Sequence, residues 1–164
     1  MIRVASHAVA DTQALAAAVA PLLEHGELIL LGGELGAGKT VFTQGLARAM
    51  GVEEAVTSPT FTLLRSYDAP GGRRLLHADL YRLEHLQEVL DLGLAEMIED
   101  VTVTVVEWGD VASPVLPADH LDVHIAFGDR SGTGNGEDER VLTLSSVGPR
   151  WTGRLSSLAS AVGA

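Results

Sequence analysis

The chain has 164 residues, 46% of them hydrophobic, which is enough for one domain with a substantial core and too few for two ordinary domains. Its 22 acidic and 11 basic residues give a net charge of −11, which argues against a broad basic surface for nucleic acid or anionic lipid. The absence of cysteine excludes disulfides, thiolate metal sites and a cysteine nucleophile, and it fits a cytoplasmic protein. We therefore expect a single domain over residues 1–164, which meets RNA only through another protein and does not bind a membrane.

The first 20 residues contain an apolar stretch that could be taken for a secretory signal. Asp11 and Gln13 interrupt it, and no run reaches the ~18 apolar residues that a membrane span needs. Apolar residues recur at helical spacing from residue 15 onward. We interpret this region as a helix of a soluble protein, capped at residues 11–12 and running to about residue 23.

The next segments alternate between strand and helix patterns, which is typical of an α/β fold. An apolar strand at 28–31 leads into a glycine loop at 33–40 and a helix at 41–50 that Gly51 closes. Two strands follow at 62–67 and 73–79, then a helix at 84–98 with a weak point at Gly93 and a buried strand at 101–106. Strands at 121–127 and 140–144 flank a glycine-rich, mobile loop at 128–139. The last predicted element is a helical stripe of apolar residues at 151–158.

The glycine loop matches G-x-x-x-x-G-K-[ST], and the pattern encodes a mechanism. Successive backbone N–H groups can wrap a phosphate only where glycines leave room for its approach. Lys39 supplies a compact positive charge to the β- and γ-phosphates, and the Thr40 hydroxyl is a ligand for Mg²⁺. The helix that follows points its positive end at the anion. The segment therefore predicts binding of ATP or ADP with Mg²⁺.

Lys39 is the only lysine of the chain, since the other ten basic residues are arginines. A composition that otherwise avoids lysine has kept one where a point charge suits a phosphate better than a planar fork does. The same count excludes an Asn-Lys-x-Asp motif for guanine, because no second lysine exists to build it.

Two carboxylates end predicted strands, Asp79 after residues 75–78 and Glu107 after residues 101–106. Ligands of open α/β sheets gather at the carboxyl ends of strands, so both acids are candidates for the metal and the attacking water. If the hairpin pairs symmetrically about Pro70, Tyr67 faces Arg73 and Phe61 faces Asp79. That register brings residues 58–60 alongside the Asp79 carboxylate.

Four segments carry a resemblance to a known family: Gly-Glu-Leu-Gly-Ala-Gly-Lys-Thr at 33–40, Ser-Pro-Thr-Phe-Thr-Leu at 58–63, His-Ala-Asp-Leu-Tyr-Arg-Leu at 77–83 and Val-Glu-Trp at 106–108. In order and spacing they resemble the bacterial tRNA threonylcarbamoyladenosine biosynthesis ATPase, the TsaE (YjeE) family. The resemblance covers residues 11–147. It implies a P-loop NTPase-like domain with a mixed β-sheet flanked by helices, which supports threonylcarbamoyl transfer to the adenosine beside the anticodon of certain tRNAs.

The resemblance also implies partners and residue roles. The partners are the subunits TsaD and TsaB, and the family is a weak ATPase alone that becomes active in its complex. The implied nucleotide contacts are Gly33, Leu35, Gly36, Ala37, Gly38, Lys39, Thr40 and Trp108. The implied metal ligands are Thr40 and Glu107, the latter directly or through water. The implied catalytic residues are Asp79, Lys39 and Thr60, the last in a switch-like segment at 58–62.

Four further features have two interpretations each. An arginine near the nucleotide is typical of the family, and either Arg130 or Arg140 can fill that role, while base contacts are expected around residues 9–12. For His77 we favour a packed strand histidine over a ligand, and for Arg82 an ion pair with Glu84 or Glu88 over an arginine finger. The stripe at 151–158 is interpreted as core packing rather than partner docking.

Two other function classes remain open at this point. A small-molecule kinase shares the loop and the metal acid, but it needs an arginine-rich lid and an acceptor pocket, for which the sequence has no signal. A non-hydrolysing nucleotide-dependent adaptor would bind ATP and change partners without turning it over. Hydrolysis by an Asp79→Asn variant distinguishes this adaptor from an ATPase.

Overall fold

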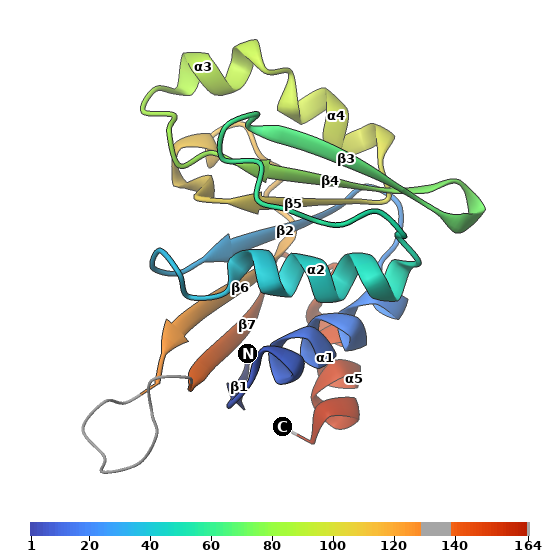
Figure 1. Cartoon of the computed structure of the whole chain (residues 1–164). Coiled ribbons are helices and arrows are strands. Elements are labelled where there is room, and N and C mark those ends of the chain that lie inside the picture. The colour runs from blue at the N-terminus through green and yellow to red at the C-terminus, as the bar shows by residue number, and fades with distance from the viewer. Residues whose placement is uncertain (129–138, 164) are drawn as a thin grey trace.

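In the computed structural model, which describes residues 1–128 and 139–163, the chain folds into a seven-stranded sheet flanked by helices (Figure 1). The elements are β1 (Ile2–Ser6), α1 (Val9–Val19), η1 (Ala20–Leu22), β2 (Glu27–Gly32), α2 (Lys39–Met50), β3 (Leu64–Ala69), η2 (Pro70–Gly72), β4 (Arg73–Asp79), α3 (Leu86–Asp91), α4 (Leu94–Asp100), β5 (Val103–Glu107), η3 (Gly109–Ala112), β6 (His120–Phe127), β7 (Arg140–Val147) and α5 (Thr152–Val162). The predicted α/β class with a mixed sheet is confirmed.

The strand order is β1-β7-β6-β2-β5-β4-β3. β2 is parallel to β5 and β6, and β4 is parallel to β5, whereas β1, β3 and β7 run antiparallel to their neighbours. β2 and β5 have the continuous apolar sequences that central strands covered on both faces require. Their carboxyl ends therefore meet at one edge of the sheet, together with the end of β4.

Two hydrophobic clusters hold the layers together. The larger cluster joins one face of the sheet to α1, α2 and α5, and the smaller one joins the other face of β4 and β5 to α3 and α4 (Figure 1). Neighbouring residues of β4 divide between them, since Leu75 belongs to the first cluster and Leu76 to the second. α1 passes close to α2 at Gly45, where a Cβ atom would lie 2.6 Å from Cα of Gln13. This contact holds α1 beside the helix that follows the glycine loop.

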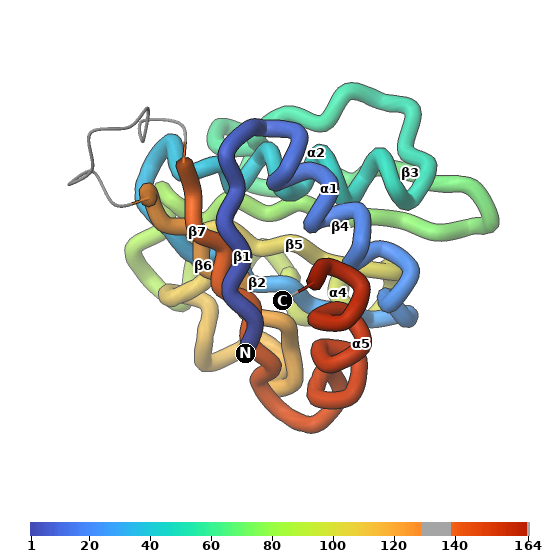
Figure 2. The backbone as a smooth tube through the Cα atoms, turned by 90° about the horizontal axis from the view of Figure 1, so that it is seen from below, coloured from blue at the N-terminus to red at the C-terminus, as the bar shows by residue number. Residues whose placement is uncertain are grey.

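The start of the chain differs from the prediction, which had no strand before the first helix. β1 pairs with β7 at the edge of the sheet, where Figure 2 shows the two segments side by side. Asp11 does not cap α1 as its first residue: Ala8 is the N-cap, and the Asp11 carboxylate accepts hydrogen bonds from the backbone N–H groups of His7 (2.8 Å) and Ala8 (3.1 Å). Local periodicity missed β1 because a five-residue edge strand is specified by a distant partner.

The predicted register of the β3–β4 hairpin is wrong by two residues. Ala69 pairs with Arg73 and Tyr67 with Leu75, because Pro70–Gly72 form a tight three-residue turn instead of a five-residue loop. Gly71 adopts φ 76°, which a residue with a Cβ rarely tolerates. A shift of two residues leaves each side chain on its predicted face, whereas a shift of one would have exchanged the faces.

Two other boundaries are corrected. The single predicted helix at 84–98 is divided into α3 and α4 at Gly93, whose φ of 65° breaks the helical path. β7 extends to Val147, three residues beyond the prediction. Trp151, Leu155 and Leu158 are buried, which confirms the core interpretation of their stripe.

Residues 129–138 of the predicted loop lie outside the described part of the chain. No helix of the described residues has the length and apolar character to cross a membrane.

Candidate active site

The glycine loop joins the carboxyl end of β2 to the first turn of α2, as the sequence predicts. Gly33 has φ 133°, and a Cβ there would lie 2.2 Å from the backbone oxygen of Ile125 on β6. Gly38, the residue before α2, has φ 114°. Both positions therefore require glycine, the first for a close approach of β6 and the second for its backbone conformation. The loop is left with its backbone N–H groups near the positive end of α2.

Lys39 begins α2, and only 4% of it is exposed. Its Nζ donates hydrogen bonds to the backbone oxygens of Gly33 (2.9 Å) and Glu34 (3.0 Å) and lies 4.2 Å from the ring centroid of Trp108. Burial lowers the pKa of Lys39, and the negative charges of Glu107 and Asp79 act in the opposite direction. The side chain thus folds back over the loop, where a phosphate oxygen would replace the two carbonyl oxygens as the hydrogen-bond acceptor of Nζ.

Glu107 lies at the end of β5, opposite Asp79 of β4 and Leu31 of β2. Thr40 Oγ1 donates a hydrogen bond to Glu107 Oε1 at 3.3 Å, so the two predicted metal ligands are adjacent. Hydroxyl and carboxylate oxygens are the donors that Mg²⁺ prefers, and magnesium sites usually take their remaining ligands from phosphates and water. The described residues contain no cluster of three or more His, Cys, Asp or Glu side chains that could hold a metal without such help. This donor set therefore fits Mg²⁺ bound together with a phosphate ligand.

Asp79 is 3% exposed and accepts hydrogen bonds from two hydroxyls on the segment before β3. Thr60 Oγ1 donates to Asp79 Oδ2 at 2.6 Å, and Ser58 Oγ donates to the same oxygen at 3.0 Å. The backbone N–H of Tyr81 donates to Oδ1 at 3.1 Å. The segment thus meets Asp79 as predicted although the register was wrong, because a tight turn after Pro59, with Leu63 at φ 64°, returns the chain toward β4.

A cavity of about 380 Å³ brings these groups together. Its lining residues come from the glycine loop, α2, the segment before β3 and the ends of β4 and β5: Leu35, Gly36, Gly38, Lys39, Thr40, Val41, Ser58, Thr60, Asp79, Tyr81, Glu107 and Trp108. Trp108 has φ 59° and packs against Tyr81, with 5.2 Å between ring centroids. Every residue predicted for catalysis or metal binding lines this one cavity.

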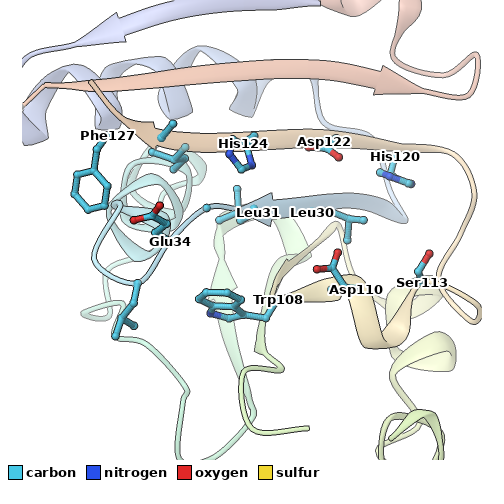
Figure 3. Close-up of a pocket in the computed structure, with 16 residues that line it drawn as sticks. Leu30, Leu31, Glu34, Trp108, Asp110, Ser113, His120, Asp122, His124 and Phe127 are labelled. Carbon is cyan, nitrogen blue, oxygen red and sulfur yellow. The ribbon is translucent and has the colours of Figure 1, made fainter. Parts of the chain in front are cut away.

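A larger cavity of about 840 Å³ lies beyond Trp108, along β2 and β6 (Figure 3). In Figure 3 His120, Asp122 and His124 project in a row from β6, and Asp110 lies below Leu30 of β2. This cavity shares the start of the loop but has none of the residues Lys39, Thr40, Asp79 and Glu107 in its lining. The reactive groups are therefore in the smaller cavity, despite the difference in size.

A third cavity of about 380 Å³ continues from the loop toward the start of α1. Its lining includes Val9 and Thr12, within the range where base contacts were expected, together with Gly38 of the loop. Arg140 also lines it, and its guanidinium lies 4.4 Å from the ring centroid of Phe127. Arg130, the other candidate arginine, lies outside the described residues.

Two side chains make contacts that differ from those favoured by the sequence. His77 is fully buried, as a packed strand histidine would be, but its Nε2 lies 2.8 Å from Glu107 Oε1. His77 lies two residues before Asp79 and therefore on the same face of β4, and this spacing could have predicted that His77 lies near the two acids. The guanidinium of Arg82 lies 4.4 Å from the exposed Phe61 ring, and within residues 1–128 and 139–163 it forms no ion pair with Glu84 or Glu88.

A strand, a glycine loop at a helix N-terminus, and carboxylates at the ends of neighbouring parallel strands define a P-loop nucleoside triphosphatase fold. The family model described as "Threonylcarbamoyl adenosine biosynthesis protein TsaE" matches residues 6–133. The chain belongs to this family, which confirms the resemblance that the four sequence segments indicate.

Similar proteins agree with this assignment. The chain is 38% identical to the tRNA threonylcarbamoyladenosine biosynthesis protein TsaE of Bacillus subtilis (strain 168), over 86% of this chain and 83% of that protein. It is 43% identical to the Streptomyces coelicolor protein of the same name, over 81% of this chain and 88% of the relative. A crystal structure of Bacillus subtilis YdiB has a TM-score of 0.80 and 30% identity, covering 97% of this chain and 94% of the other.

Proposed function

We propose that this chain is the ATP–Mg²⁺-binding P-loop ATPase of tRNA threonylcarbamoyladenosine biosynthesis, acting as one domain over residues 1–164 in the cytoplasm. Family membership supports the pathway. One observation carries the activity: the Lys39 ammonium, the Thr40–Glu107 pair and the Asp79–Thr60 pair all line a single cavity of about 380 Å³ at the glycine loop.

Phosphate binding begins with the loop and Lys39. A phosphate in the loop would accept hydrogen bonds from the backbone N–H groups of residues 33–40, and the Lys39 ammonium would turn from the carbonyls of Gly33 and Glu34 to the β- and γ-phosphate oxygens. Leu35, Gly36, Ala37 and Gly38 give the loop its path, and the ring of Trp108 lies over the Lys39 ammonium. The base would enter the cavity beside Val9 and Thr12, with Arg140 at its wall.

Thr40 and Glu107 would hold Mg²⁺. When bound, this ion offsets the charge of the phosphates and of the leaving group. Thr40 Oγ1 would exchange its hydrogen bond to Glu107 for the ion, and Glu107 would bind the ion directly or through a water molecule.

Asp79 would orient the attacking water. Its Oδ2 already accepts two hydroxyl hydrogen bonds, so Thr60 and Ser58 fix the carboxylate while it accepts a hydrogen bond from the water. The segment at 58–62 contains the exposed Phe61, which places it at the surface. A partner that moves this segment would change the position of Asp79, which would account for weak hydrolysis by the chain alone.

The partners we propose are the TsaD and TsaB subunits of the threonylcarbamoyl transfer complex. The net charge of −11 favours contact with tRNA through those subunits rather than by this chain itself.

ATP turnover by the purified chain, alone and with TsaB and TsaD, tests the proposal. We expect stimulation by both subunits together and its loss in Lys39→Ala. Transfer of phosphate to a compound in a metabolite panel would indicate a kinase instead, and binding without turnover in the presence of the subunits would indicate an adaptor. Calorimetry that detects no heat for ATP or ADP with Mg²⁺ would overturn the nucleotide site itself.

A further inference from the structure

His77 occupies a place in the site that none of the proposed roles uses. Its imidazole is 0% exposed, on the face of β4 that also presents Asp79. Parallel pairing sets His77 opposite Val105 and Asp79 opposite Glu107. The imidazole therefore comes two residues before the acids along the strands, on the side away from their carboxyl ends. From there Nε2 reaches Glu107 Oε1 at 2.8 Å.

The hydrogen bonds of Glu107 are unequally divided between its two oxygens. His77 Nε2 and Thr40 Oγ1 both contact Oε1, and no other described group hydrogen-bonds this carboxylate. Oε2 has no hydrogen bond from a described group, so it is the oxygen that a ligand beside Thr40 can reach without competing with His77. Because the imidazole holds Oε1, rotation of the carboxylate would break a hydrogen bond in a buried place.

The partners also define the tautomer of His77. In the contact with Glu107 the carboxylate oxygen is the acceptor, so the Nε2–H of His77 is the donor. Nδ1 is buried and has no hydrogen-bond partner among the described residues, so a proton there would be an unsatisfied buried donor. The arrangement places the Nε2–H donor of His77 on Glu107 Oε1, and carboxylates that bind metals are commonly held by such hydrogen bonds from outside the site.

Core packing alone does not account for this residue. The neighbours of His77 on the same face, Leu75 and Val105, are apolar members of the larger core cluster. A buried aliphatic residue would continue that cluster, whereas histidine leaves Nδ1 without a partner. The polar character is used only at Nε2, toward Glu107.

We propose that His77 is a positioning residue, which holds Oε1 of Glu107 so that Oε2 faces the cation beside Thr40. This inference rests on the proposed function, because the cation is the Mg²⁺ of the nucleotide site. The effect of His77 is then on metal coupling and not on the binding of nucleotide without metal.

The test compares two substitutions of His77, one that keeps a hydrogen-bond donor and one that removes it. In His77→Gln the side-chain amide can place an N–H donor near the position of Nε2, whereas His77→Leu has no donor. Calorimetric titration of ADP at a series of Mg²⁺ concentrations gives the factor by which Mg²⁺ tightens binding. We expect His77→Leu to reduce that factor by about 10-fold or more, the usual effect of losing such a hydrogen bond, and His77→Gln to restore most of it. ADP affinity without Mg²⁺ should stay within about threefold in both variants.

Each other outcome has a defined meaning. A metal coupling factor within about twofold of wild type in His77→Leu would overturn the positioning role. Equal losses with and without Mg²⁺, with no recovery in His77→Gln, would also overturn it in favour of packing alone. If His77→Leu does not fold, His77→Asn replaces it, because its amide is too short to reach Glu107. Failure of wild-type protein to bind ADP would instead refute the proposed function.

Discussion

The two ends of the β2–β5 pair each carry a buried glutamate, but the surroundings differ. At the amino end of β2, Glu27 accepts hydrogen bonds from Trp151 Nε1 (2.8 Å) and Arg154 Nη1 (2.5 Å), and Arg154 also pairs with Glu24. At the carboxyl end of β5, Glu107 accepts only from a hydroxyl and an imidazole among the described groups.

The difference lies in how the charge is compensated. Arg154 neutralises Glu27 and ties α5 to the sheet, so this carboxylate is part of the fold. Glu107 receives hydrogen bonds from a hydroxyl and an imidazole, and the nearby lysine already contacts the loop, so no arginine pairs with Glu107 as Arg154 does with Glu27 among the described residues. The same residue type in the same sheet therefore stabilises the fold at one end, and at the other end it is the residue that we propose binds the cation.

The largest effect is expected at the functional end, from Asp79→Asn. Loss of the carboxylate that we propose orients water should reduce subunit-stimulated ATP hydrolysis by about 100- to 1,000-fold, with nucleotide affinity changed by less than about threefold. Single-turnover hydrolysis and calorimetry measure the two quantities. Asp110→Asn, an exposed acid of the larger cavity, is the matched control and should keep full activity. Unchanged turnover in Asp79→Asn would remove Asp79 from the mechanism.

The next largest effect is expected at the structural end, from Arg154→Met. The change leaves Glu27 buried without its cation and should lower the free energy of unfolding by about 3 kcal/mol. Urea denaturation followed by circular dichroism measures it. Arg150→Met is the control, because Arg150 is exposed and its guanidinium makes only a 3.4 Å contact with the backbone oxygen of Gly26. Equal stability of the two variants would contradict the structural role of the pair.

The difference in role between the two glutamates is tested by neutralising each of them in turn. Glu107→Gln should weaken the Mg²⁺ dependence of ADP binding by about tenfold, with a stability change below about 1 kcal/mol. Glu27→Gln should lower stability without any change in the metal titration. If both variants lose the same property, the two ends are not functionally distinct.

The smallest effect is a pH dependence that comes from Lys39. Its pKa in the folded protein is lowered from the ordinary 10.5 by burial, so affinity for ATP should fall as pH rises through that lowered value, by up to about tenfold per pH unit. The stability term has the opposite sign: between the lowered pKa and 10.5 the unfolded state binds more protons, so stability increases with pH. Lys39→Arg should keep its charge and show a flat binding profile, measured by calorimetry. A wild-type profile as flat as that of the arginine variant would contradict the shift.

The functional end could be predicted from the sequence to a greater extent than the structural end. The strand, glycine loop and helix are adjacent in sequence, so their pattern directly predicted that Lys39 and Thr40 lie where the loop meets the helix. Asp79 and Glu107 followed from the rule that ligands gather where parallel strands end. The contacts of Glu27 with Trp151 and Arg154 bring together residues far apart in the chain, and no local pattern revealed them. The same limit explains the missed strand β1, which pairs with the distant β7.

The hairpin shows why an incorrect register still gave the correct neighbours. Symmetric pairing about Pro70 assumed a five-residue loop, and the observed turn is shorter. The error was an even number of residues, so the faces of β4 were right, and the turn after Pro59 supplied the approach of Thr60 to Asp79. Face alternation is thus predictable from sequence where exact pairing is not.

The burial of Lys39 has a practical consequence for chemical labelling. Since it is the only lysine, reagents that acylate side-chain amines can modify this chain at one position, besides the terminal amine. Its lowered pKa gives it a larger share of unprotonated amine near neutrality than an ordinary lysine has. A nucleotide in the cavity that Lys39 lines would further exclude reagent from this buried amine, so a slower acylation by a small ester, read by mass spectrometry, would report occupancy of the proposed site without any engineered label.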